Sequence, residues 1–182
     1  QQQVSFSTNY YATEVRMAVK ANSTVKDLGD LNGKAVATTQ GTTSDKYIKM
    51  GAKGEQVKVT NVYGKDHSDS FAMVASGRAA AFVMDDNILA GLIAKSSKPK
   101  DFKIVGPVLS SEPYGIMLPK GDAAYKAIAD KVVTGMWKNG QMAALYKKWF
   151  QSPIPPKNIN LNMPMSTSYN KLKAAPNDKG IN

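Results

Sequence analysis

The sequence predicts an α/β fold built on an open, mostly parallel sheet. Two patterns support this prediction. Short apolar runs, typical of buried strands, alternate between residues 34 and 108 with segments whose apolar residues recur at helical spacing. A polar or glycine-containing cluster separates the apolar runs from the helices that follow them. Strands and helices that alternate in this way form parallel sheets, because each helix carries the chain back to the start of the next strand.

The first elements are connecting strands. Residues 4–19 hold extended, alternating stretches that place Val15, Met17 and Val19 on one face. A polar turn at residues 20–23 ends them.

Repeated βα units are expected after this turn. The predicted strands are Lys34–Gln40, Val57–Val62, Ala79–Met84 and about Phe102–Val108. The predicted helices follow the first three of these strands: one ends near Lys53, one carries Phe71, Val74 and Ala75 at helical spacing, and one runs from Asn87 to about Lys95.

The last part of the chain is predicted to be helical. An extended segment at Tyr114–Pro119 leads into two amphipathic helices that Gly140 separates. Their apolar stripes are Tyr125, Ile128, Val132 and Met136 in the first helix, and Met142, Leu145 and Trp149 in the second. Both stripes need a partner surface. Beyond residue 152 the chain is rich in proline and asparagine and is interpreted as a surface tail with a short helix near Ser168–Ala174.

Composition narrows the class of protein. The 182 residues are 42% apolar, enough to bury a core in one domain or in two small lobes. There is no cysteine, which excludes a disulfide framework and a thiolate metal site. No apolar run is long enough for a membrane span, and the first residues lack the features of a signal peptide. We therefore expect soluble material from which any export signal has already been removed.

The charge favours acidic partners. The net charge is +10, which points to nucleic acid, an anionic membrane or acidic small molecules. The lysines are scattered singly or in pairs rather than massed between aromatic residues, so no nucleic-acid partner is expected.

Polar clusters follow three of the predicted strands, at the place where open α/β sheets bind ligands. Gly41, Thr42, Thr43 and Ser44 offer hydroxyls and free backbone N–H groups at a helix N-terminus, which favours an anion such as a carboxylate. The alternative is a simple helix cap, since Ser and Thr are common caps. The cluster is therefore a candidate carboxylate site and a candidate cap at once.

The other two clusters hold one histidine and one pair of acids. His67 is the only histidine, flanked by Asp66, Ser68 and Asp69, and its imidazole could meet an anionic side chain. A structural or exposed histidine is the alternative. Asp86 ends the third strand with Asp85, where one carboxylate could accept hydrogen bonds from an ammonium group; Asp86 as a helix cap is equally compatible.

Enzymatic and cofactor motifs are missing from the sequence. It contains no G-x-S-x-G elbow, no histidine pair at helical spacing, no EF-hand loop, no P-loop and no G-x-G-x-x-G. Neighbouring Ser68 or Ser70 beside His67 is a weak substitute for a triad, because triad partners come from separate elements. We therefore expect no catalytic residue, no metal site and no cofactor.

These residues carry a resemblance to a known family. The segments concerned are Phe6-Ser7, VKAN at 19–22, DLGDLNGKAVATTQGTTSD at 27–45, KDHSDSF at 65–71, SGRAAAFVMDDNILAG at 76–91, YGIMLPKGD at 114–122, and YKKWF at 146–150 followed by PIPPKNINLN. Together they resemble the periplasmic amino-acid-binding proteins of ABC transporters, in the glutamate/aspartate branch.

The resemblance implies a periplasmic-binding-protein type II fold, in which two α/β lobes joined by two crossing strands close on a ligand. Residues 15–114 would form a complete second lobe with a ligand half-site. Residues 1–14 would be a hinge strand and a remnant of the first lobe. Residues 115–182 would be a crossover strand followed by C-terminal helices and a tail. Only these helices and the tail would represent the first lobe.

The resemblance also implies a function and a site. The protein would be a periplasmic receptor that binds L-glutamate or L-aspartate and delivers it to an ABC transporter membrane permease. Gly41, Thr42, Thr43 and Ser44 would hold the α-carboxylate or neighbouring polar groups, His67 the side-chain carboxylate, and Asp86 the α-ammonium group. A ligand-binding sensor module and a cyclohydratase-like enzyme on the same fold are the alternatives.

Two departures from the family pattern lead to further expectations. The chain begins after most of the first lobe and after the arginine that pairs with the ligand carboxylate, and the FSDPY-like hinge reads FSTNY at residues 6–10. Ligand affinity of these residues by themselves should therefore be weak. Without the rest of that lobe, the apolar stripes lose their partner, so the C-terminal helices should either pack on another copy, giving a homodimer, or fold back on the strands near Val4–Val19.

Overall fold

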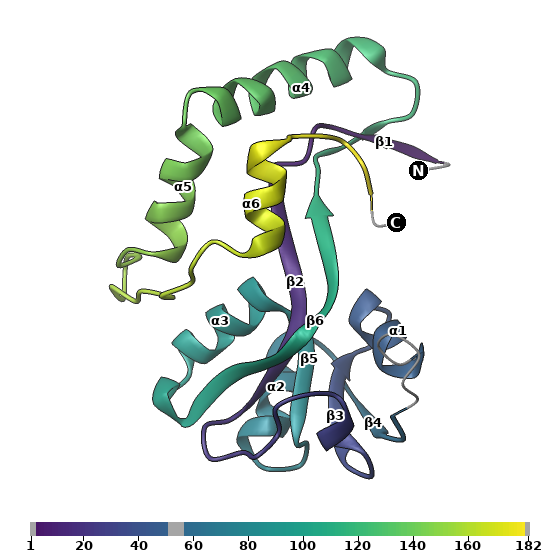
Figure 1. The fold of residues 1–182 in the computed structure, drawn as a ribbon, viewed down its shortest axis with the longest axis vertical. Helices are drawn as coiled ribbons and strands as arrows, with labels where there is room; N and C mark the ends of the chain where they lie inside the picture. The colour runs from purple at the N-terminus through teal and green to yellow at the C-terminus, as the bar shows by residue number, and fades with distance from the viewer. Residues whose placement is uncertain (1–2, 51–56, 181–182) are drawn as a thin grey trace. The chain divides into compact units, whose positions relative to one another are not determined.

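The computed structural model describes residues 3–50 and 57–180, which divide into two compact units. One unit is the continuous stretch Glu14–Ser110, and the other combines Gln1–Thr13 with Ser111–Asn182 (Figure 1). The assignment of these units to the lobes of a binding protein stays a prediction.

The continuous unit is built on a five-stranded sheet. Its strand order is β4-β3-β5-β2-β6. The strands are β2 (Tyr11–Lys20), β3 (Ala35–Thr39), β4 (Thr60–Gly64), β5 (Ala81–Asp85) and β6 (Phe102–Tyr114). The strand β3 is parallel to both β4 and β5, while β2 runs antiparallel to β5, with Val15 opposite Asp85. The predicted α/β fold is confirmed, with a mixed sheet whose three βα strands are parallel.

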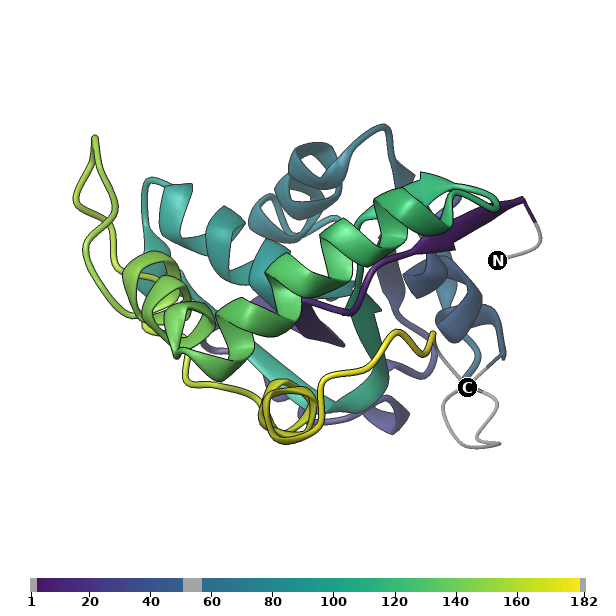
Figure 2. The ribbon, with the colours of Figure 1, turned by 90° about the horizontal axis from the view of Figure 1, so that it is seen from above.

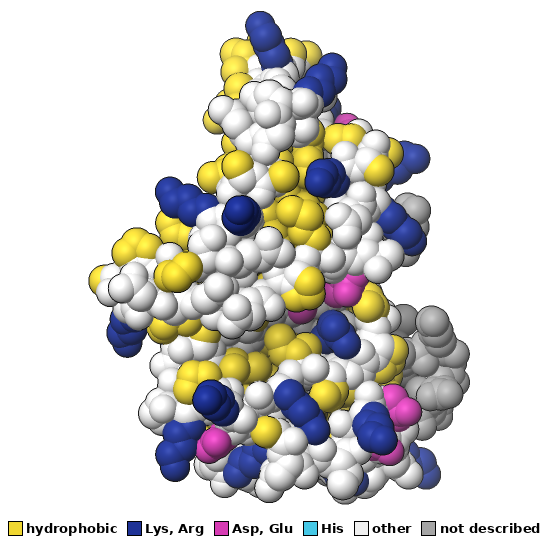
Figure 3. All heavy atoms as spheres, turned by 60° about the vertical axis from the view of Figure 1, so that its left-hand side comes forward, with side chains coloured by type: hydrophobic (Ala, Val, Ile, Leu, Met, Phe, Trp, Pro, Cys, Tyr) yellow, Lys and Arg dark blue, Asp and Glu magenta, His cyan; other side chains and the backbone are white. Residues whose placement is uncertain are grey.

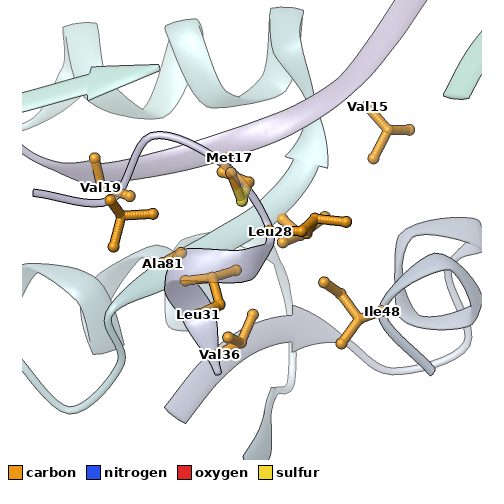
Figure 4. Packing of buried hydrophobic residues seen from close by; sticks show 10 residues of the cluster. Val15, Met17, Val19, Leu28, Leu31, Val36, Ile48 and Ala81 are labelled. Atoms are coloured by element: carbon orange, nitrogen blue, oxygen red, sulfur yellow. The ribbon is translucent and has the colours of Figure 1, made fainter. Parts of the chain in front are cut away.

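Helices and a turn segment cover both faces of this sheet. The helices are α1 (Thr43–Met50), α2 (His67–Ala75) and α3 (Asp86–Lys95), with short 3₁₀ turns at Gly29–Leu31 and Pro99–Asp101. Alternate residues of each strand point to opposite faces. On one face Val15, Met17 and Val19 pack with Leu31 of the turn segment and Ile48 of α1 (Figure 4).

The opposite face buries a second cluster. Ala18 and Phe82 from the strands pack there with Phe71 and Val74 of α2 and Leu89 of α3. The apolar residues predicted to anchor the second helix are therefore buried, except for Ala75, which is exposed. A sheet buried on both faces explains why its strands appear in the sequence as continuous apolar runs.

The start of one predicted strand differs from the structure. The strand β4 starts at Thr60 rather than Val57, because its partner β3 begins at Ala35, which lies opposite Thr60. Val57 and Val59 still pack, half-buried, against the first core cluster. The predicted end of the first helix near Lys53 lies outside the described residues.

The discontinuous unit combines a small sheet with three helices. The strands β1 (Val4–Phe6) and β7 (Met117–Pro119) pair antiparallel. The helices are α4 (Ala123–Lys138), α5 (Gln141–Phe150) and α6 (Thr167–Ala174). Gly140 adopts a φ of 81°, a conformation that favours glycine, and α5 turns away from α4 there (Figures 1 and 2). The prediction that Gly140 separates two helices is confirmed.

Aromatic side chains form the centre of this unit. Tyr11, Tyr146 and Tyr169 are buried together, and the rings of Tyr146 and Tyr169 lie 4.5 Å apart between centroids. The Tyr169 hydroxyl donates to the carbonyl oxygen of Met142 over 3.3 Å. Burial raises the pKa of Tyr169 to about 12, because the phenolate would lose its hydration there.

The predicted apolar stripes of α4 and α5 are largely uncovered. Ile128 is 63% exposed, Val132 56%, Leu145 39% and Trp149 44%. The helices do meet the first residues of the chain, but through other side chains: Trp137 Nε1 donates to the carbonyl oxygen of Asn9. The helices therefore fold back on the residues near the first strands, although the stripe residues themselves stay exposed. Packing on another copy stays a prediction.

Candidate functional site

The candidate site lies at one edge of the five-stranded sheet. The parallel strands β3, β4 and β5 end at Thr39, Gly64 and Asp85, and α1, α2 and α3 begin shortly after them. Because carboxyl ends of parallel strands meet at the same edge, the three polar clusters are brought to one side of the sheet (Figure 1).

The first cluster makes the turn from β3 into α1. Gly41 has a φ of 79°, which a residue with a side chain would adopt only with strain. The Thr42 hydroxyl donates to the carbonyl oxygen of Thr39 over 2.8 Å and accepts the backbone N–H of Asp45 over 3.4 Å. Thr42 therefore caps α1, as the alternative interpretation proposed.

The other two residues of this cluster differ in exposure. Thr43, the first residue of α1, is half-buried, while Ser44 is fully buried. The Ser44 hydroxyl points to the sulfur of Met84 at 3.9 Å. Gly41, Thr42 and Thr43 are thus accessible to a ligand, whereas Ser44 ties α1 to the end of β5.

The second cluster places His67 at the first position of α2. Asp66 caps this helix by accepting the backbone N–H of Asp69 over 2.8 Å. The Nδ1 atom of the half-buried His67 lies 2.9 Å from the Thr39 hydroxyl. The imidazole is therefore held at the end of β3, beside the turn that carries Thr42.

The third cluster places Asp86 at the first position of α3, with Asp85 in the capping position. Asp86 is 8% exposed, and its Oδ1 atom accepts the backbone N–H of Asn87 over 2.8 Å and that of Glu14 over 3.3 Å. Because Asp86 belongs to the helix and Asp85 precedes it, the capping interpretation does not apply to Asp86. Two backbone N–H groups thus hold this oxygen in place.

Several residues of this edge were not anticipated. Thr39 joins the first two clusters, since it contacts both Thr42 and His67. Asp45 accepts hydrogen bonds from Asn61 Nδ2 over 2.8 Å and from the Tyr63 hydroxyl over 3.2 Å. Hydroxyl and amide side chains at the ends of buried strands were the available signal, because such positions are otherwise apolar.

The geometry suits a small zwitterion better than a metal. A helix N-terminus, an imidazole and a carboxylate occupy the same edge, and these groups match a carboxylate, a second anion and an ammonium group. Within the part of the chain that the structure describes, no group of three His, Cys, Asp or Glu side chains could hold a metal ion. In the same residues, no helix is long and apolar enough to cross a membrane.

The three polar clusters lie at the sheet edge where open α/β proteins bind their ligands. The sequence profile of the bacterial extracellular solute-binding proteins, family 3, matches residues 1–152. The chain belongs to this family.

Individual relatives narrow the comparison. The chain is 45% identical over 179 residues to the L-glutamate/L-aspartate-binding protein of Pseudomonas aeruginosa, covering 98% of this chain and 59% of that protein. It is 41% identical over 182 residues to the glutamate/aspartate import solute-binding protein of Salmonella typhimurium, covering 100% of this chain and 60% of that protein. The chain thus spans about 60% of the length of these relatives, which are named as binding proteins and not as enzymes.

Solved structures show the same fold. The ligand-binding core of GluR0 from Nostoc punctiforme, in complex with L-glutamate, superposes with a TM-score of 0.68 at 29% identity, covering 82% of this chain and 66% of that one. The substrate-binding protein of an amino acid ABC transporter superposes with a TM-score of 0.68 at 25% identity. The predicted type II periplasmic binding fold is confirmed by these neighbours.

Proposed function

We propose that this protein is the solute-binding subunit of an ABC importer and that it binds L-glutamate or L-aspartate. The observation that carries the proposal is the meeting of Thr42, His67 and Asp86 at one sheet edge, in a chain 45% identical to a glutamate/aspartate-binding protein. In this proposal residues 15–114 form one lobe, and residues 1–14 and 115–182 belong to the other. The protein works in the periplasm and delivers its ligand to a membrane permease.

Each candidate residue has a role in this proposal. The N-terminus of α1, with Gly41, Thr42 and Thr43, receives the α-carboxylate or neighbouring polar groups, and the buried Ser44 supports this turn through its contact with Met84. The ring of His67 meets the side-chain carboxylate, and Asp86 accepts hydrogen bonds from the α-ammonium group. The net charge of +10 favours the approach of an acidic ligand.

The first test is calorimetry on the full-length protein. Binding of L-glutamate or L-aspartate is expected, because a dicarboxylate with one ammonium group matches one helix N-terminus, one imidazole and one carboxylate. Tight binding of lysine or arginine without any response to glutamate would contradict the proposal.

The second test separates the roles of two residues. Replacing Asp86 by Asn should weaken all amino-acid ligands, since every one of them carries the ammonium group. Replacing His67 by Ala should weaken acidic ligands preferentially, by about 1.5 to 3 kcal/mol for a charge-assisted hydrogen bond. Equal losses for glutamate and glutamine in the His67→Ala protein would show that the imidazole does not read the side-chain carboxylate.

A further inference from the structure

A chain of hydroxyl groups lies behind His67. The Nδ1 atom of His67 is 2.9 Å from the Thr39 hydroxyl, which is itself 2.9 Å from the Ser70 hydroxyl. The Ser70 hydroxyl lies 3.0 Å from the carbonyl oxygen of Asp66 and 3.2 Å from that of Thr38. Thr39 and Ser70 are buried, so this chain is shielded from solvent.

Counting hydrogens fixes the direction of every bond in this chain. Carbonyl oxygens only accept, so the single hydrogen of Ser70 is donated to one or both of its two carbonyl partners. Ser70 therefore accepts at its contact with Thr39, and the hydrogen of Thr39 is donated to Ser70. Thr39 then has only a lone pair to offer the imidazole, so His67 Nδ1 must be the donor.

We infer that Thr39 and Ser70 are positioning residues that hold a hydrogen on Nδ1 of His67 and leave Nε2 as the ring nitrogen that meets the ligand. Gly64 makes this possible, because a Cβ at this position would overlap the backbone and hydroxyl of Ser70. Thr39 and Ser70 are 31 residues apart in the sequence, yet their hydroxyls meet behind one ring.

What the tautomer of His67 means for ligand binding rests on the proposed function. When the ring is an imidazolium, Nε2 carries a hydrogen and donates to the side-chain carboxylate of an acidic ligand in a charge-assisted bond. When the ring is neutral, Nε2 presents a lone pair, which is the wrong partner for a carboxylate and a suitable one for an amide N–H. By keeping the hydrogen of the neutral ring on Nδ1, the buried hydroxyl chain determines which ligand groups can bind to Nε2.

The test is a direct observation of the tautomer by ¹⁵N nuclear magnetic resonance on the full-length protein without ligand. The His67 signals are assigned by their loss in the His67→Gln protein and are recorded at a pH where the ring is neutral. The wild-type ring should carry its hydrogen on Nδ1. A ring protonated on Nε2 would overturn the inference.

Two variants test the hydroxyl chain itself. In the Ser70→Ala protein, Thr39 loses its acceptor and is free to donate to Nδ1, so the tautomer should shift toward Nε2–H. Replacing Thr39 by Val should abolish the preference, while Thr39→Ser, which keeps the hydroxyl, should restore it. The matched control is Ser76→Ala at the end of the same helix, where the hydroxyl donates to the carbonyl oxygen of Met73 and no change is expected. An unchanged tautomer in Ser70→Ala would contradict the inference even if Thr39→Val failed to fold.

Calorimetry with glutamate separates this inference from the proposed function. Thr39→Val should weaken glutamate binding about threefold to tenfold, the usual range for one hydrogen bond, and Thr39→Ser should not. A wild-type protein with the Nδ1–H tautomer that ignores glutamate would support the hydroxyl chain and refute the proposed ligand. A protein that binds glutamate equally well with Val at position 39 would refute the positioning role alone.

Discussion

Asp130 and Lys126, both on α4, together connect three segments of the discontinuous unit. Asp130 accepts the backbone N–H of Thr8 over 2.6 Å and the ammonium group of Lys126 over 2.9 Å. Lys126 also donates to Phe6 and pairs with Asp178 at 3.1 Å. Burial by itself would raise the pKa of Asp130, but the hydrogen bonds from Lys126 and Thr8 outweigh it and hold the pKa below its ordinary value of 3.8.

The first stability prediction concerns this carboxylate. Replacing Asp130 by Asn should lower the free energy of unfolding by about 1 to 2 kcal/mol at pH 7, since charged hydrogen bonds are lost at a partly exposed site. A lowered folded-state pKa means that the stabilisation is present above pH 3.8 and is lost as the pH falls through the folded value. Thermal unfolding from pH 7 down to pH 2 should therefore show the difference from wild type shrinking in acid.

A matched variant checks the cause. Asp178 pairs with the same lysine but is 55% exposed at its side chain. Asp178→Asn should therefore cost much less than Asp130→Asn. Equal effects, or a difference that does not depend on pH, would show that the bonds to Thr8 and Lys126 are not what stabilises this unit.

Individual site residues could be predicted only where they follow a predicted strand, because that position in the sequence marks a candidate binding residue. Thr42, His67 and Asp86 each follow an apolar run, and that position was enough to single them out. Thr39 lies within such a run, and its role depends on α2 approaching β3 closely enough for Ser70 to meet it. That approach is a property of packing between segments 31 residues apart, which local patterns do not contain.

At the scale of elements, α2 and β4 approach most closely at Gly64. A Cβ there would overlap Ser70 of α2, and the overlap includes backbone atoms that cannot rotate away. Gly64→Ala should therefore push α2 from the sheet and lower the free energy of unfolding by about 1 to 3 kcal/mol, as overpacking of a buried contact does. Urea unfolding of the variant measures this cost.

Gly91 provides the comparison. It lies inside α3, and a Cβ there would meet no atom within 4 Å. Gly91→Ala should stabilise the protein by about 0.5 to 1 kcal/mol, because alanine loses less freedom in a helix than glycine does. If Gly64→Ala and Gly91→Ala changed the free energy of unfolding in the same direction, the close approach of α2 to Gly64 would be contradicted.

The types of the elements could be predicted because the hydrophobic spacing typical of helices and that typical of strands are local properties of the sequence. The ends of the elements depend on the residues that pair with them or cap them. The strand β4 begins where β3 offers a pairing partner at Ala35, and α2 begins at His67 because Asp66 caps it. The strand β6 runs to Tyr114, beyond the predicted end near Val108. It contains Pro107, which is tolerated because β6 lies at an edge of the sheet.

At the scale of the whole molecule, the surface carries uncovered apolar side chains beside scattered lysines (Figure 3). Ile128 and Val132 lie one turn apart on α4 and are both more than half exposed. Burying such side chains contributes about 1.5 to 3 kcal/mol each, so an assembly in which they are covered is favoured. For residues 1–182 by themselves, a second copy is the predicted cover.

Light scattering over a range of concentrations tests this prediction. The 182-residue chain should form dimers, and the double variant with Ser in place of Ile128 and Val132 should shift it toward monomer. Lys131→Ser, an exposed change on the same helix, should leave the association unchanged. A chain that stays monomeric at every concentration would rule out the homodimer.

The pairing of β1 with β7 sets an order of events during synthesis on the ribosome. Val4 pairs with Pro119, so the first strand emerges long before its partner exists, while the unit Glu14–Ser110 between them is continuous. At about 5 to 20 residues per second, the roughly 115 intervening residues take on the order of ten seconds to translate. The inserted unit can fold during this delay, and once folded it shortens the span that must be closed to join β1 to β7.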